Sequence, residues 1–154
     1  MGLVTRNNMR SYMLVNGVYC EIGEGFTDFT ENKNPREYAR QYIHESSERT
    51  DLVGFAPSVT SAFDVFDADA VQAALMEITV SEAIGDAAVV TVVTAFLQNR
   101  NDDGHAHAYR REYTVCPAKL GTGTDALICS GTLKAHGDPV YGVFDTEALE
   151  FIEW

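Results

Sequence analysis

The stretch that decides the fold is residues 34–66, NPREYARQYIHESSERTDLVGFAPSVTSAFDVF. Residues 36–43 fit two patterns: their apolar residues have the i, i+1, i+4, i+5 spacing of a helix, and the same side chains alternate as in a strand. Residues 45–51 are polar throughout, and residues 58–66 resume the alternation of a strand. Periodicity therefore leaves residues 36–43 open between helix and strand, and it predicts a long polar excursion after them.

The flanking sequence has the pattern of a mainly antiparallel β protein. Asn16-Gly17 lies between two β-rich runs and predicts a hairpin, whereas residues 26–35 have the composition of a loop. Residues 68–80 carry an apolar stripe at helical spacing after Asp67, a residue type that caps helix N-termini. Residues 87–98 are β-branched and nearly all apolar, as in a buried strand.

These elements predict a single α+β domain over residues 1–154. We expect a β-sandwich or half-barrel of mainly antiparallel strands, flanked by one α-helix at about 68–80 and carrying a long hairpin loop. Three segments are expected outside the body of this domain: an N-terminal arm at 1–10, an extended loop at 44–54 and a C-terminal tail at 146–154. The chain is 45% hydrophobic and 22% charged, which is typical of globular proteins.

The composition excludes several classes of function. The net charge is −12, and residues 50–99 contain no Lys or Arg, so the surface should repel nucleic-acid phosphates rather than bind them. No segment approaches the roughly 18 apolar residues that a membrane span needs, so we expect no membrane contact. The three cysteines are widely spaced in apolar runs, which predicts reduced core thiols in a cytosolic setting.

One cluster has the residue types of a metal site. His105 and His107 are two positions apart, which would place both on the same side of a strand close to Asp102 and Asp103. The same residues are ordinary at a solvated hairpin tip, and a third firm ligand is missing. The GTGTD run at 121–125 lacks the lysine of a phosphate-binding loop, and there is no GxSxG elbow. We therefore expect no catalytic site and no cofactor.

The segment NPREYARQYIHESSERTDLVGFAPSVTSAFDVFDADAV resembles the major tail tube proteins of long-tailed bacteriophages, which are related to the tubes of contractile tails and type VI secretion. The similarity includes the Asn-Pro start, the Y-x-x-x-Y-I run, the polar ESSERTD, the VGFAPS turn and the strand before the helix. Downstream, SGTLKAHGD looks like a strand common near the end of such proteins. The resemblance covers roughly residues 10–145.

The resemblance implies a structural subunit that is not an enzyme. In such proteins six subunits form a ring around a lumen, and the rings stack into a tube that conducts genomic DNA during ejection. The resemblance makes 36–43 and 58–66 strands and 44–54 the loop that reaches the adjacent ring. The expected loop residues are Glu45, Ser46, Ser47, Glu48, Arg49 and Thr50. Asp51 and Asp64 become candidates for acidic residues that face the lumen.

The expected partners are further copies of the chain, together with tape-measure, tail-terminator and distal tail proteins. DNA would pass through the lumen without specific binding, and the product would be a virion component assembled in the host cytoplasm. Two alternatives remain open. One is the inner tube of a contractile tail or of a secretion or injection device, and the other is a small metal-dependent enzyme or binding protein that uses His105 and His107.

Overall fold

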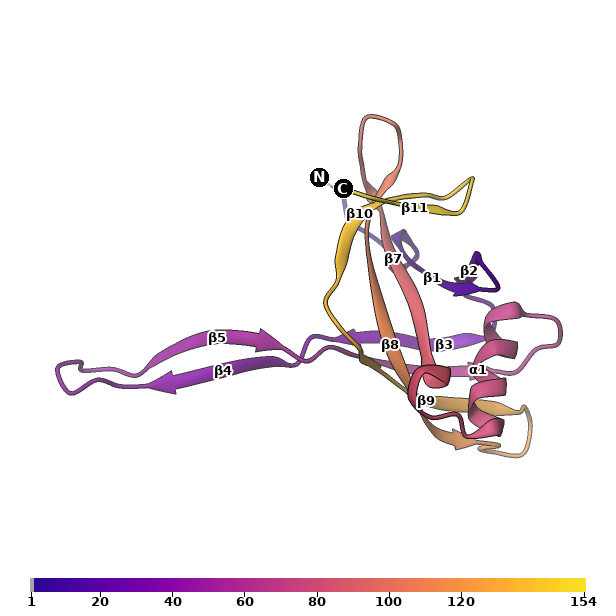
Figure 1. Ribbon diagram of the computed structural model, residues 1–154, viewed down its shortest axis with the longest axis horizontal. Helices are drawn as coiled ribbons and strands as arrows, with labels where there is room; N and C mark the ends of the chain where they lie inside the picture. Colours follow the sequence, from indigo (N-terminus) through magenta and orange to yellow (C-terminus); the bar gives the residue numbers. More distant parts are fainter. Residues whose placement is uncertain (1) are drawn as a thin grey trace.

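A computed structural model describes residues 2–154 as a curled antiparallel sheet with one helix and a long projecting ribbon (Figure 1). The strands are β1 (Met9–Val15), β2 (Val18–Ile22), β3 (Phe26–Asn32), β4 (Pro35–Arg40), β5 (Arg49–Phe55), β6 (Ser58–Asp64), β7 (Val89–Arg100), β8 (Ala106–Leu120), β9 (Ile128–Ala135), β10 (Val140–Asp145) and β11 (Glu150–Glu153). The helices are α1 (Ala70–Ser81) and the 3-10 turns η1 (Arg6–Asn8) and η2 (Gly85–Ala88).

The main sheet has nine strands, and its path runs β2-β1-β7-β8-β9-β6-β3. Strand β10 pairs with one end of β8 and with β11. Because the long strand β8 pairs with β10 along one end and with β9 along the other, the sheet curls rather than staying flat. This curled sheet with one helix confirms the predicted α+β half-barrel.

Successive side chains of the sheet face two different cores. In β7, Val92 belongs to a core beneath α1 with Leu75, whereas its neighbour Val93 belongs to a second core with Phe144 of β10. This separation follows from the two-residue period of a strand. A strand buried on both faces needs apolar residues at nearly every position, which explains the composition of residues 87–98.

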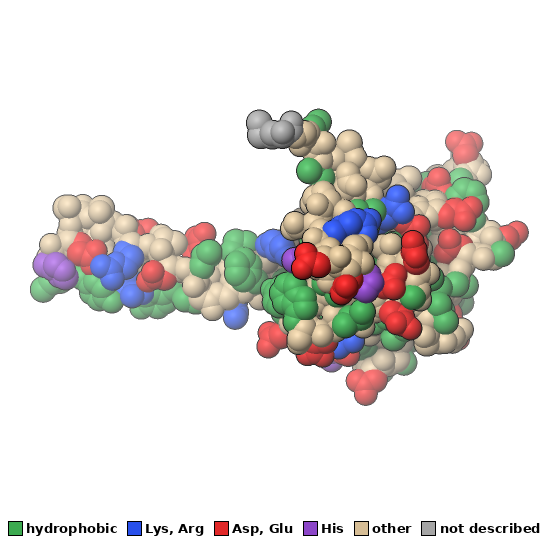
Figure 2. Space-filling view, turned by 90° about the horizontal axis from the view of Figure 1, so that it is seen from above, with side chains coloured by type: hydrophobic (Ala, Val, Ile, Leu, Met, Phe, Trp, Pro, Cys, Tyr) green, Lys and Arg blue, Asp and Glu red, His purple; other side chains and the backbone are tan. Residues whose placement is uncertain are grey.

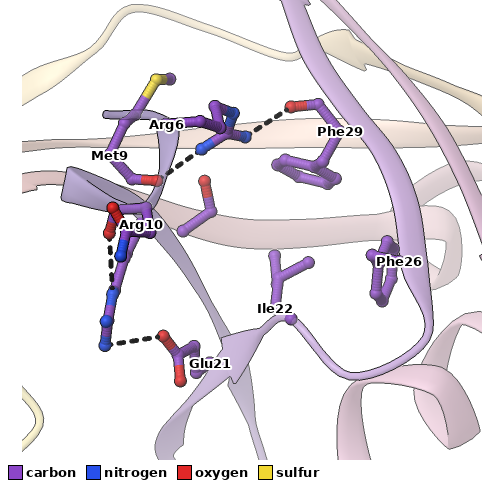
Figure 3. A pocket seen from close by; sticks show the side chains of 10 residues that line it. Arg6, Met9, Arg10, Glu21, Ile22, Phe26 and Phe29 are labelled. Carbon is purple, nitrogen blue, oxygen red and sulfur yellow. Dashed lines mark hydrogen bonds and ion pairs between the residues drawn. The ribbon is translucent and has the colours of Figure 1, made fainter. Parts of the chain in front are cut away.

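The gap between the two ends of the curled sheet is bridged by arginine. A pocket with a volume of about 500 Å³ lies between the start of β1 and the edge strands β2 and β3 (Figure 3). Arg6 donates to the carbonyl oxygens of Met9 at 2.5 Å and Phe29 at 3.1 Å, and Arg10 pairs with Glu21 at 3.3 Å. The segment expected as an N-terminal arm thus includes the η1 turn, which Arg6 ties to β3, and the first two residues of β1.

The helix lies close to its predicted position, but its cap differs. Asp69 rather than Asp67 is the N-cap, and its side chain accepts a hydrogen bond from the backbone N–H of Gln72 at 3.1 Å. Both aspartates are suitable capping types. Ala68 has a positive φ, so the helix starts after it, and Asp69 is the residue immediately before the first helical residue, Ala70. The predicted hairpin at Asn16-Gly17 is present, with positive φ at both residues as a two-residue turn requires.

Three segments contain strands that the sequence did not predict. Residues 26–32 form β3, although their polar composition predicted a loop; they lie at the sheet edge, where half of the positions can be solvated. Residues 49–55 form β5, so the extended loop predicted at 44–54 is only its first part. Residues 150–153 form β11, although they belong to the segment expected as a tail. Among residues 2–154, no helix has the length and apolarity of a membrane span.

Candidate self-assembly surface

Strands β4 and β5 form a two-stranded ribbon that extends away from the body (Figure 1). They pair with each other from Pro35–Phe55 at the base to Arg40–Arg49 near the tip, with a bulge between Arg36 and Glu37. The helix-or-strand question at 36–43 is thus settled as a strand that ends at Arg40. Its partner is β5 and not the strand at 58–66, which pairs with β3 and β9 in the body.

One face of the ribbon combines aromatic and cationic side chains. The Arg40 guanidinium lies 4.5 Å from the ring centroid of Tyr38 and 5.1 Å from that of Tyr42, and Arg49 lies 5.5 Å from the Tyr42 ring. Arg40 Nε also donates to the Tyr42 hydroxyl at 2.5 Å, and this bond is the main cause that raises the pKa of Arg40. These contacts hold the side chains of an otherwise solvated strand pair in place.

The ribbon also exposes large apolar side chains along its length (Figure 2). Leu52 and Val53 are each 61% exposed, and Ile43 at the tip is fully exposed. Tyr38, Tyr42 and Phe55 are between 43% and 54% exposed. An isolated two-stranded hairpin is marginally stable in water, and contiguous exposed apolar surface typically marks a site of protein contact. The ribbon is therefore the strongest candidate for an assembly surface.

The six predicted loop residues lie at the end of the ribbon, divided between a turn and a strand. Residues 45–48 belong to the turn, in which Gln41 Nε2 donates to the Glu45 carbonyl oxygen at 2.8 Å. Arg49 and Thr50 belong to β5 instead of the loop, and Arg49 pairs with Glu45 at 3.6 Å. Arg49 thus has an ion-pair partner within its own chain.

The two candidate lumen acids lie in different sheets. Asp51 is on the ribbon, where its carboxylate is 3.4 Å from the Arg40 guanidinium. Asp64 ends β6 in the body, where its backbone N–H donates to the Gly25 carbonyl oxygen at 2.8 Å. The sequence placed both residues in one segment, but the folded chain does not bring them together.

The two histidines considered for a metal site have different partners. His105 lies just before β8 and is 3.5 Å from the Asp145 carboxylate, whereas His107 packs edge-on against the Trp154 ring. The backbone N–H groups of Ala148 and Glu147 donate to Asp145 and, with a smaller effect of His105, lower the pKa of that carboxyl. Across residues 2–154, no group of three or more His, Cys, Asp or Glu side chains has an arrangement that could hold a metal ion.

No protein-family model and no curated protein matches this sequence. The fold, however, is similar to that of chains in solved structures. A chain in the cryo-EM structure of the anti-feeding prophage (AFP) baseplate has a TM-score of 0.51 and 12% identity, over 90% of this chain and 94% of that chain. A chain in the extended sheath–tube complex of an extracellular contractile injection system, PVC, has a TM-score of 0.50 and 12% identity, over 92% of both chains.

A third similar chain comes from the extended sheath/tube terminator structure of the PVC system, with a TM-score of 0.51 and 11% identity, over 92% of this chain and 97% of that chain. At such low identities the similarity establishes the fold alone. The chain thus has a fold similar to that of chains in contractile injection system structures, which agrees with the fold that the resemblance implied.

Proposed function

We propose that this chain is a structural subunit of a phage tail tube, in which six copies form a ring and rings stack around a lumen that conducts DNA. The observation that carries the proposal is the β4–β5 ribbon, which extends from the curled sheet with its apolar side chains exposed. A neighbouring ring would cover this surface and thereby stabilise the ribbon. Tape-measure, terminator and distal tail proteins would bind the finished tube at its ends.

A second candidate is the inner tube of a contractile tail or injection device, and the similar chains from contractile injection systems favour it. The two candidates share the subunit and the stacking contact. They differ in whether a sheath surrounds the tube. Electron microscopy of particles purified from the producing cells would distinguish them, since a sheath changes the outer diameter and the surface of the tube.

Negative-stain microscopy of the purified protein over a range of concentrations tests the proposal. We expect rings with a central hole at moderate concentration and stacked tubes at high concentration. A protein that stays monomeric at every concentration, alone and after addition of preformed tail tips, would contradict it. Stoichiometric zinc uptake by such a monomer would instead support the metal-dependent alternative at His105 and His107.

A further inference from the structure

A groove at the base of the ribbon has a different chemistry from the rest of this acidic molecule. Two adjoining cavities of about 640 and 600 Å³ lie between the ribbon base and strands β8, β9 and β10. We call the two cavities together the basic groove. Its lining includes the cations Arg36, Arg111 and Lys134, the rings of Phe55 and Tyr141, and one carboxylate, Asp138, which lines both cavities.

The cations of the basic groove have unused capacity to bind carboxylates. Within residues 2–154, Arg36, Arg111 and Lys134 form no ion pair, whereas Lys33 at the groove edge pairs with Glu31 at 2.6 Å. Nε of Arg111 is buried and has no hydrogen-bond partner among the described residues. Arg36 and Lys134 are exposed, so a carboxylate supplied from outside the chain can pair with these two cations.

The local sequence keeps Arg36 at the groove. Gly54 lies directly across the ribbon from Arg36, and a Cβ at Gly54 would come within 2.8 Å of the guanidinium. The absence of a side chain at Gly54 therefore lets the arginine lie flat over the ribbon base. Phe55 follows immediately and is 54% exposed, which places an apolar ring beside the charge.

The opposite side of the molecule carries a segment with complementary properties. Residues 77–86, EITVSEAIGD, form the end of α1 and the turn after it, on the side of the body away from the ribbon (Figure 1). Val80 and Ile84 are 67% and 86% exposed, and they alternate with the exposed carboxylates of Glu77, Glu82 and Asp86. Figure 2 shows acidic side chains over the end of the body farthest from the ribbon.

The stretch around this acidic segment supplies no counter-charge. Residues 50–99 contain no Lys or Arg, and none of the ion pairs among residues 2–154 involves Glu77, Glu82 or Asp86. The segment therefore presents apolar residues flanked by free carboxylates, and the basic groove presents rings flanked by free cations.

We propose that the basic groove of one copy binds the acidic segment 77–86 of the next copy. This inference rests on the proposed self-assembly and identifies one contact within it. The two surfaces lie on opposite sides of the chain, so the contact is head-to-tail, and such contacts generate closed rings or helical assemblies. Val80 and Ile84 would pack on Phe55 and Tyr141, while the carboxylates would pair with the groove cations and fix the orientation.

Charge reversal on each side tests the contact. The groove variant is Arg36→Glu with Lys134→Glu, and the segment variant is Glu77→Lys with Glu82→Lys; all four side chains are exposed, so both variants should fold. Lys119→Glu and Asp125→Lys are control variants, since each makes one charge reversal of the same kind as a groove or a segment substitution, at an exposed position outside both surfaces. Circular dichroism checks the fold, and sedimentation velocity with negative-stain microscopy measures assembly.

We expect each double variant alone to lose ring and tube formation, because like charges then face each other across every contact. An equimolar mixture of the two variants should regain rings, since alternating copies restore an opposite-charge pair at every interface. The control variants should assemble like the wild type.

The outcomes separate this inference from the proposed function. Wild-type protein that never assembles would overturn both. A wild type that assembles while both variants also assemble would overturn this contact alone. Loss of assembly in both variants without recovery in the mixture would likewise overturn the pairing of these two surfaces, and would point to another acidic partner for the groove.

Discussion

Gln72 Nε2 donates to the backbone carbonyl oxygen of Asp64 at 3.0 Å, which joins the first turn of α1 to the end of β6. The same nitrogen donates to the Glu24 carbonyl oxygen at 2.7 Å, and Gln72 Oε1 accepts from the Phe66 backbone N–H at 2.7 Å. Only 1% of the Gln72 surface is exposed. One buried amide thus satisfies three backbone groups from two connections and positions the helix over the half-barrel.

Replacement of Gln72 by leucine should therefore destabilise the fold strongly. The apolar side chain is similar in size, but it leaves those part-buried backbone groups without their side-chain partner, and we expect a loss of about 3 kcal/mol in the free energy of unfolding. Urea denaturation followed by circular dichroism measures it. Glu77→Gln on the exposed face of α1 is the control and should change the stability by less than about 0.5 kcal/mol. Equal stabilities of the two variants would show that the amide has no such role.

Gly25 should be equally intolerant of substitution, for a steric reason. Its φ is +80°, and a Cβ there would lie 2.5 Å from the Asp64 carbonyl oxygen and would also contact the Gln72 amide. Gly104 has nearly the same φ, +79°, but a Cβ there meets nothing within 4 Å. Gly104→Ala should cost about 1 kcal/mol through the backbone alone, whereas Gly25→Ala should cost clearly more. Thermal denaturation of both variants would test this, and similar melting temperatures would contradict it.

The parts of the fold that could be predicted from sequence are those where burial imposes a period. Val71 and Leu75 repeat at helical spacing because they face one core, and the valines of β7 are consecutive because that strand is buried on both faces. Strand β4 has no buried residue, so no core favours one period over the other, and residues 36–43 fit helix and strand equally.

The candidate surface was harder to predict because its contacts join residues that are distant in sequence. Arg49–Asp51 are polar on a strand that is solvated on both faces, so they have the composition of a loop. The basic groove brings Arg36 together with Arg111 and Lys134 from two other strands, and no local sequence pattern predicts that these three residues lie close together. The family resemblance gave the loop as 44–54, and within the named residues Glu45–Thr50 the structure leaves only 45–48 outside strand β5.

The exposed ribbon should matter for assembly and little for the stability of the free subunit. Leu52→Glu changes a side chain that is 61% exposed, so the unfolding free energy should stay within about 0.5 kcal/mol of the wild type. Ring stacking should be lost, since a carboxylate would have to be desolvated at the contact. Leu127→Glu, at a residue of 48% exposure on the body, is the matched control. Tubes of normal length from Leu52→Glu would contradict the assignment.

One buried tyrosine, Tyr113, and one partly buried tyrosine, Tyr109, should make the fold sensitive to alkali. Burial raises the pKa of Tyr113 to about 12, and burial together with the hydrogen bond from its hydroxyl to Glu31 raises the pKa of Tyr109 above its ordinary value. The unfolded chain ionises each tyrosine near pH ~10, so the folded state holds these protons more tightly. Their contribution to stability is complete below about pH 10 and is lost as the pH rises through the folded-state pKa.

Tyr113→Phe tests the alkaline effect because it keeps the ring and removes the ionisable group. Between pH 9 and pH 11.5, the wild type should lose about 2 kcal/mol more unfolding free energy than this variant. Tyr141→Phe, which changes a tyrosine that is 57% exposed, is the control and should follow the wild type. Parallel pH profiles of wild type and Tyr113→Phe would show that the Tyr113 hydroxyl has the same pKa in the folded and the unfolded state.

The acidic charge should keep DNA from adhering to the wall of an assembled tube. Asp51→Lys with Asp64→Lys would place cations at both candidate lumen positions, and Lys side chains bind phosphates with a strong dependence on salt. Because the Asp51–Arg40 pair is solvated, its loss should cost the subunit less than about 1 kcal/mol. We expect tubes of this variant to retain double-stranded DNA in a low-salt filter assay and phage carrying it to eject DNA more slowly. The single variants show whether the ribbon or the body residue faces the lumen, and unchanged infectivity of the double variant would remove both from it.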